Sequence, residues 1–288
     1  MLEACNSALS LRDVYLKGYE SQYSCSPMRK MRGPPAKLKG VVIFDMDDTL
    51  VNREDVFLQA QRGLLTMLKR RLRNVRPRRD IDRLREVDYE LVRLHGHRYM
   101  YDPLLLVYAL WYSYHEGKSP RQAAKSALLA RPACLSYQFA HVAATRYISV
   151  LGDTVPEVID DAYLVLCKLK QSYVLVLLAS GEKGIQTSVI RGLGFDAIFD
   201  VLMVVERKNP SSFRKAARLG LKVLGTTRQV GRVGVFSVGD RISTDILPAK
   251  AIGATTIWMP GRYRPGTAAE AQPDHIIGRL RDLLQILT

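Results

Sequence analysis

Four polar segments of the chain carry side chains suited to metal binding or to the transfer of protons and other groups. They are Asp45 to Leu50, Ser180 with Gly181, Lys208 to Phe213, and Gly239 to Asp245. Taken alone, each segment is as simply interpreted as a loop, a helix cap or a solvated lysine. Each follows a stretch that predicts a strand, however, and together they indicate one site where carboxylates, a hydroxyl and an ammonium group meet.

The aspartates indicate that this site binds a metal ion. Asp45 and Asp47 follow a buried strand directly, where two carboxylates are costly unless a cation neutralises them. Asp240 and Asp245 would add to the same negative cluster. Oxygen ligands without histidine or cysteine are those that Mg²⁺ prefers. The sequence therefore predicts a magnesium site.

The elements that must position these residues alternate between strand and helix. Short apolar runs predict strands at 40–44, 173–178, 233–238 and 255–259, with a partial strand near 201–205. Helical spacing predicts helices at 155–170, 183–193, 210–219 and 245–252. The alternation predicts an α/β fold with a doubly wound, Rossmann-like parallel sheet. Ligands of such sheets bind outside the carboxyl ends of the strands, where the four polar segments fall.

A long helical insertion interrupts this alternation after the first strand. Apolar spacing predicts five helices, at 54–74, 80–95, 103–116, 120–130 and 135–150. We therefore expect an α/β core made of residues 37–52 and 153–288 and an all-helical cap subdomain at 53–152. Residues 1–36, with a basic cluster and the breaker Gly33-Pro34-Pro35, predict a flexible N-terminal appendage.

The ordered set of motifs resembles the haloacid dehalogenase superfamily, in its phosphatase branch with a helical cap inserted after the first motif. Asp45, Asp47 and Thr49 match D-x-D-x-T, and Ser180 matches the hydroxyl residue that follows a later strand. The last two motifs are matched by Lys208 with Pro210 and Phe213, and by Gly239, Asp240 and Asp245. Two positions depart from the usual pattern: Asp48 replaces a frequent glycine and Asn209 a frequent proline.

The resemblance implies a role for each of these residues. Asp45 would attack the substrate phosphorus as nucleophile, and Asp47 would act as general acid and then general base. Mg²⁺ would be held by the carboxylates of Asp45 and Asp240 and by the backbone carbonyl of Asp47. Ser180, the amide of Gly181 and Lys208 would bind the phosphoryl oxygens. Thr49 would steady Asp47, and Asp245 would orient Lys208 or a metal-bound water.

These roles predict a magnesium-dependent phosphohydrolase that works through an aspartyl-phosphate. Dehalogenase members lack the second aspartate, so Asp47 favours phosphoryl transfer. A cap over the site favours a small phosphorylated metabolite as substrate. Two alternatives stay open: a phosphomutase or phosphotransferase on the same scaffold, and a non-catalytic, basic protein that associates with nucleic acid. Arg98 is a candidate specificity residue, although a simple link between two helices is the favoured interpretation of its segment.

The formal net charge of +15 is the unusual feature of the composition. Most of the excess lies in the predicted cap, and it is densest at 69–79. Such a run can attract nucleic acid, but no aromatic side chain interleaves it to stack on bases, which argues against that partner. The alternative interpretation is a solvated helix end that raises the potential around a phosphorylated substrate.

The cysteines and the hydropathy of the sequence indicate where in the cell the protein is located. Four cysteines lie far apart in sequence, which is typical of reduced thiols in a cytoplasmic protein. The longest apolar runs, such as 103–111, are too short to cross a bilayer, and the first residues do not resemble a secretory signal. We therefore expect a cytoplasmic monomer or homodimer without a membrane partner.

Overall fold

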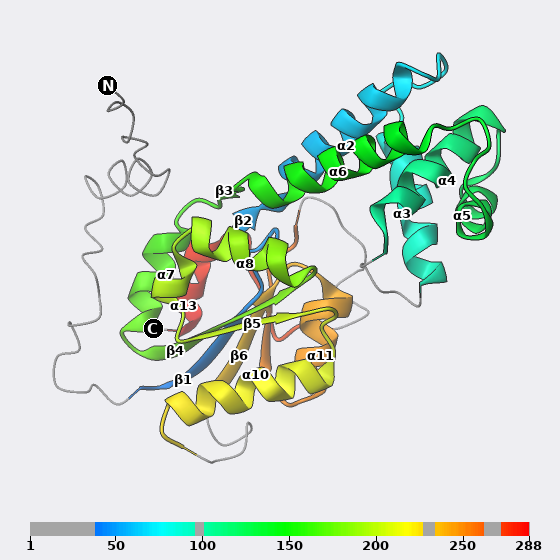
Figure 1. The fold of residues 1–288 in the computed structure, drawn as a ribbon. Helices are drawn as coiled ribbons and strands as arrows, with labels where there is room; N and C mark the ends of the chain where they lie inside the picture. Colours follow the sequence, from blue (N-terminus) through cyan, green and yellow to red (C-terminus); the bar gives the residue numbers. More distant parts are fainter. Residues whose placement is uncertain (1–37, 96–100, 227–233, 262–271, 288) are drawn as a thin grey trace, which may run out of the picture.

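The computed structural model describes residues 38–95, 101–226, 234–261 and 272–287 (Figure 1). The expected appendage at 1–36 and the candidate Arg98 lie outside these residues. No helix in the described ranges is long and apolar enough to span a membrane.

A parallel sheet of six strands forms the centre of the fold, in the order β5-β4-β1-β6-β7-β8. The strands are β1 (Gly40–Phe44), β4 (Tyr173–Ser180), β5 (Val201–Val205), β6 (Gly234–Gly239), β7 (Thr255–Trp258) and β8 (His275–Ile276). This sheet confirms the predicted α/β class. The strand expected at 173–178 continues to Ser180, so the hydroxyl of the second motif ends the strand rather than following it.

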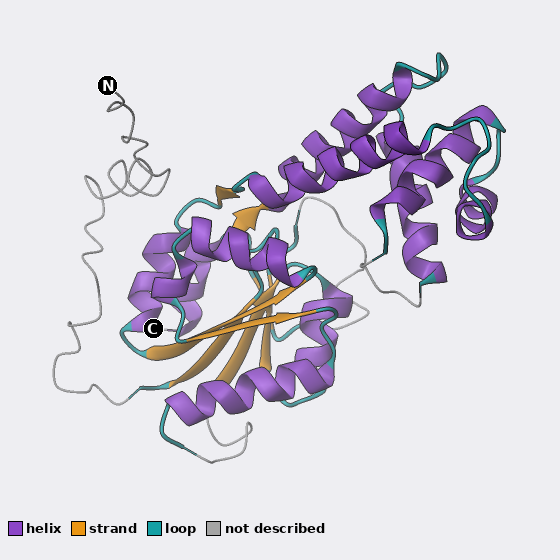
Figure 2. Cartoon of the chain, viewed as in Figure 1, coloured by secondary structure: helices purple, strands orange, loops and turns teal. Residues whose placement is uncertain are grey.

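Helices cover both faces of the sheet, as Figure 2 shows. Val42 and Phe44 pack in the cluster that includes α7 (Ala162–Lys170), α8 (Lys183–Gly192) and α13 (Leu283–Leu287). Val41 and Ile43 point to the other face, in the cluster with α10 (Pro210–Val223). Since successive strand residues face opposite sides, a strand covered on both sides must be apolar throughout. Shorter helical segments are α9 (Phe195–Ile198), η2 (Ile242–Ile246), α11 (Leu247–Lys250) and η3 (Leu280–Asp282).

The inserted helices form a second group with a core of their own, which extends away from the sheet (Figure 1). They are α2 (Arg53–Lys69), α3 (Ile81–Leu94), α4 (Pro103–His115), α5 (Pro120–Leu129) and α6 (Tyr137–Asp153). Helix α4 is buried from Leu106 to Tyr114, which explains why its sequence is apolar on nearly every side. The division of the chain into an appendage, a core and a cap at the stated boundaries stays a prediction.

A two-stranded antiparallel sheet joins the helical group to the core. Strand β2 (Val51–Asn52) pairs with β3 (Glu157–Val158), with Val51 opposite Val158. The helix expected over 155–170 is therefore wrong in its first turns, and α7 begins only at Ala162. Asp161, which has a left-handed backbone with φ of 65°, ends the extended segment before the helix. Both connections to the helical group thus run side by side.

Helix α10 approaches the sheet so closely that Gly220 must remain small. A Cβ at this position would lie 2.5 Å from Cγ1 of Val41. We expect Gly220→Ala to lower the free energy of unfolding by about 1–3 kcal/mol through overpacking. Gly63→Ala is the matched control, because a Cβ there meets nothing within 4 Å inside α2, and should stabilise by about 0.5–1 kcal/mol. Urea denaturation of both variants tests this, and equal effects would contradict it.

Candidate active site

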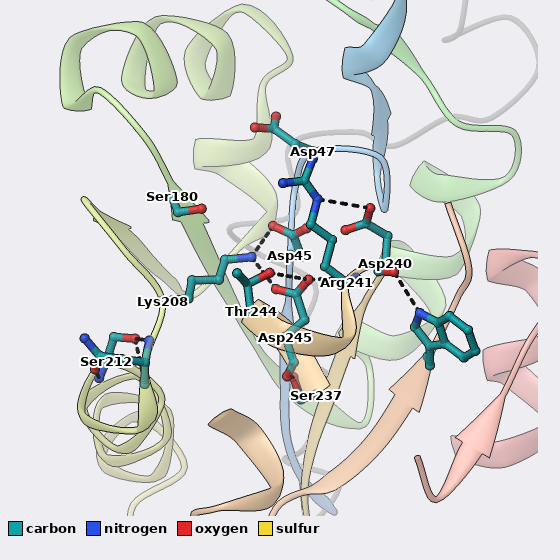
Figure 3. Close-up of polar contacts among 12 residues, drawn as sticks. Asp45, Asp47, Ser180, Lys208, Ser212, Ser237, Asp240, Arg241, Thr244 and Asp245 are labelled. Carbon is teal, nitrogen blue, oxygen red and sulfur yellow. Dashed lines mark hydrogen bonds and ion pairs between the residues drawn. The ribbon is translucent and has the colours of Figure 1, made fainter. Parts of the chain in front are cut away.

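The carboxyl ends of the parallel strands bring the four polar segments together (Figure 3). Asp45 follows β1, Asp240 follows β6, and Lys208 lies in the connection between β5 and α10. Carboxylate oxygens of Asp45, Asp240 and Asp245 all lie within 4.8 Å of one another. Residues widely separated in sequence therefore meet in one volume at the rim of the sheet.

Lys208 is the buried cation of this cluster, with 4% of its surface exposed. Its Nζ donates to Oδ1 of Asp45 and to Oδ1 of Asp245, the latter at 2.6 Å. Burial lowers the pKa of Lys208, but the Asp245 and Asp45 carboxylates together raise it by more, so the ammonium stays charged. Asn209 follows as the N-cap of α10 and accepts a hydrogen bond from the amide of Ser212. The asparagine that departs from the family pattern thus starts the helix that supports Lys208.

Asp240 directly follows β6, and Asp245 lies in the π-helical turn η2 that comes next. The turn allows the Asp245 carboxylate to accept from the amide of Arg241 at 3.0 Å while its other oxygen contacts Lys208. Gly239 is required beside it, because a Cβ there would lie only 2.4 Å from Cβ of Asp245. The backbone carbonyl of Asp240 accepts a hydrogen bond from the Trp258 indole at 2.7 Å, which fixes the loop.

The carboxylate cluster fits a divalent cation. Asp240 is buried, and its Oδ1 atom has no hydrogen-bond partner in the described part of the chain. Burial, followed by the neighbouring Asp45 and Asp245, raises the pKa of Asp240. Burial likewise raises the pKa of Asp245, and Lys208 opposes that effect. Lys208 and Arg241, whose Nε lies 3.7 Å from Oδ2 of Asp240, offset only part of the charge of the three crowded carboxylates. A hard cation bound by carboxylate oxygens would neutralise the excess negative charge.

Asp47 is held by Gln186, a residue that the sequence did not single out. Nε2 of Gln186 donates to Oδ2 of Asp47 at 2.9 Å and to the carbonyl of Ser180 at 2.9 Å. Burial raises the pKa of Asp47 by more than Arg53 and Gln186 lower it, and the raised pKa favours a protonated carboxyl. The hydroxyl of Thr49, which is expected to steady Asp47, is buried and has no hydrogen-bond partner among the residues that the structure covers. The hydrogen bond that the structure shows to the Asp47 carboxylate comes from Gln186.

Ser180 ends β4 beside the cluster and Gly181 follows it, and the Ser180 side chain points toward the same space as that of Lys208 (Figure 3). Gly181 has a φ of 139°, a region that favours glycine. Its amide donates to the carbonyl of Val205 at 2.9 Å and extends the pairing of β4 with β5. The Gly181 amide therefore already donates a hydrogen bond. To contact a phosphoryl oxygen as expected, it would have to divide its hydrogen between two acceptors or break the bond to Val205.

A pocket of about 600 Å³ connects the cluster with the inserted helices. Its floor includes Asp45, Asp47 and Lys208, and its upper wall comes from α2, α3 and α6 and from the start of α4. The helical side is partly apolar and partly polar, and it includes Arg53, Phe57, Asp88, Tyr101, Leu106, Tyr147 and Leu151. Tyr101 donates a hydrogen bond to Asp88 within this wall. No residue of the basic run 69–79 lines this pocket.

Comparisons with known proteins agree with this architecture. Residues 40–253 match the sequence model of the haloacid dehalogenase-like hydrolase family, so the chain belongs to that family. Glyceraldehyde 3-phosphate phosphatase from Pyrococcus furiosus is 24% identical, covering 86% of this chain and 92% of the relative. These findings confirm the predicted superfamily.

Solved structures share the fold. The hydrolase YfnB from Bacillus subtilis, solved with magnesium bound, matches with a TM-score of 0.60 and 19% identity, over 88% of this chain and all (100%) of that one. A phosphatase of the same superfamily from Thermococcus onnurineus matches with a TM-score of 0.51 and 23% identity, over 86% and 97% of the two chains. The neighbours therefore contain an equivalent of both the sheet and the helical insertion.

Proposed function

We propose that this chain is a magnesium-dependent phosphatase that hydrolyses a small phosphorylated metabolite through an aspartyl-phosphate. The observation that carries the proposal is the position of Asp45. Its carboxylate is held by Lys208, lies beside the orphaned oxygen of Asp240, and opens into the pocket that Asp47 also lines. The proposed nucleophile, general acid and cation site thus line the same floor of one pocket.

In the first step, a carboxylate oxygen of Asp45 attacks phosphorus, and the ester P–O bond breaks with its electron pair on the departing oxygen. Asp47, whose pKa is raised by burial, supplies the proton that turns this oxygen into an alcohol. Lys208, fixed by Asp245, stabilises charge on the phosphoryl oxygens. In the second step, Asp47 removes a proton from water, which attacks phosphorus and releases Asp45 and inorganic phosphate.

The carboxylates of Asp45 and Asp240 and the backbone carbonyl of Asp47 would hold Mg²⁺. When bound, the ion would offset the repulsion between the Asp45 carboxylate and the phosphate dianion. Asp245 is committed to Lys208 and to the Arg241 amide, so we assign it to positioning Lys208.

The size of the pocket supports a small substrate. A volume of about 600 Å³ lies within the range of small-molecule sites. The helical wall covers the reacting groups, which favours a metabolite over a folded phosphoprotein. The relative from Pyrococcus furiosus is a phosphatase named for a three-carbon phosphate ester, which agrees with this size.

Phosphate release from a panel of small phosphate monoesters, with Mg²⁺ or with excess EDTA, tests the proposal. We expect turnover that falls by roughly 100-fold or more when the metal is removed, because the carboxylate cluster then repels the phosphate. Equal release in EDTA would refute the metal requirement. Transfer of the phosphoryl group to a second sugar position, without release, would instead favour a phosphomutase.

A further inference from the structure

Arg53 is a buried cation in the pocket wall with open hydrogen-bonding capacity. It is the first residue of α2, and only 2% of its surface is exposed. Nη2 donates to the carbonyl of Leu151 at 2.6 Å, near the end of α6. Nε and Nη1 are buried and have no hydrogen-bond partner in the described ranges. Buried polar groups are bonded in the great majority of cases, so two orphaned donors on one guanidinium require an explanation.

Arg53 lies where it can contact the alcohol part of a bound phosphate ester. Arg53 lines the same pocket as Asp45 and Asp47. Asp47 on the sheet side and Tyr147 on the helical side both act electrostatically on its guanidinium. Asp47 is the proposed proton donor to the departing oxygen, so an arginine that lines the same pocket and interacts electrostatically with Asp47 can contact the carbon chain attached to that oxygen.

The chemistry of the site favours a singly charged, planar acceptor. A guanidinium donates charge-assisted hydrogen bonds to carboxylates, and these are stronger than neutral ones. Nε and Nη1 donate from different edges of the guanidinium, so one carboxylate accepts from one of them rather than from both. Asp47 and Asp48 also act on Arg53, so a second dianionic phosphate would meet their repulsion. A single carboxylate would satisfy one of the open donors, and it would meet less repulsion than a phosphate dianion. Phe57, which packs 5.5 Å from the guanidinium carbon, forms an apolar border.

We propose that Arg53 is a specificity residue that binds a carboxylate on the substrate, so that the preferred substrates are phosphate esters of short hydroxy acids. This inference rests on the proposed phosphatase function. It assigns one of the orphaned donors, Nε or Nη1, to the substrate carboxylate and leaves Nη2 with Leu151.

A purely structural role is the alternative, because the bond to Leu151 also ties α2 to α6. Arg83 provides the matched control. It lies in the same helical group, donates to the carbonyl of Ser113 on another helix, and does not line the pocket. An arginine that only links helices should affect folding but not the choice between two substrates.

The experiment compares kcat/KM for two pairs of esters in the presence of Mg²⁺. Each pair differs by a carboxylate replaced with a hydroxymethyl group: 2-phosphoglycolate with 2-hydroxyethyl phosphate, and 3-phosphoglycerate with glycerol 3-phosphate. The proteins are wild type, Arg53→Gln, Arg53→Lys and Arg83→Gln, each checked for folding by thermal unfolding. p-Nitrophenyl phosphate measures activity that does not depend on the carboxylate.

We expect wild type to prefer the acid in at least one pair, and Arg53→Gln to reduce that preference about 30-fold, mainly through KM. Arg53→Lys should restore part of it, and Arg83→Gln should leave it unchanged. A wild type that prefers the neutral esters, or a preference that survives in folded Arg53→Gln, would overturn the assignment while turnover of p-nitrophenyl phosphate still supports a phosphatase. No turnover of any ester would overturn both proposals.

Discussion

Asp45→Asn should reduce phosphate release to background, a loss on the order of 10⁴-fold or more. The amide is nearly isosteric with the carboxylate but is a far weaker nucleophile, so no acyl phosphate can form. The measurement is inorganic phosphate released from the best ester of the panel at saturating Mg²⁺. Acid-quenched wild-type protein should also carry a trace of covalent phosphate that the variant lacks.

The same variant should remain folded, which separates loss of chemistry from loss of structure. Lys208 keeps its 2.6 Å contact with Asp245, and removal of one charge relieves repulsion among the carboxylates. Asp196→Asn, an exposed position on α9, is the control and should keep wild-type activity. Equal phosphate release by wild type and Asp45→Asn would refute the nucleophile assignment.

The core fold could be predicted because its signals are local. The run from Val41 to Phe44 is apolar on both faces, and the structure places helices on both sides of it. Polar residues directly after such strands can lie only at the carboxyl edge of a parallel sheet. The meeting of Asp45, Lys208 and Asp240 follows from this topology, although each residue alone is uninformative.

The elements that the sequence did not reveal depend on contacts between distant segments. Strand β3 has two residues and exists because Val158 pairs with Val51, so helical propensity around it predicted the wrong element. Gln186 is one glutamine on a helix, where such a residue usually faces solvent, and only the packing of α8 against the sheet turns it toward Asp47.

Arg53 did leave a signal in the sequence. A cation in the first turn of a helix opposes the helix dipole, so a basic residue at that position calls for another reason to be there. The reason that we infer is a ligand in the pocket. Under this proposal, the departure from the local rule falls at a residue of the substrate pocket.

The loss of phosphatase activity in Asp47→Asn should depend on the leaving group of the ester. For an alkyl phosphate, the departing alkoxide needs a proton, and we expect a loss of about 10²–10⁴-fold. For p-nitrophenyl phosphate, the phenolate departs without a proton, so the rate of the first step should fall far less. Acid-quench measurement of the first turnover separates this step from the later attack of water, in which Asp47 is proposed to act as base.

Gln186→Leu provides an intermediate case for the same comparison. It keeps the Asp47 carboxyl but removes the 2.9 Å hydrogen bond that orients it. The rate of the first turnover should therefore fall roughly tenfold for the alkyl ester and less for the aryl ester. The exposed Gln59 of α2 offers the control, and Gln59→Leu should change neither rate. If Asp47→Asn slowed the first turnover of both esters equally, Asp47 would act on the phosphoryl group or the cation site rather than on the departing oxygen.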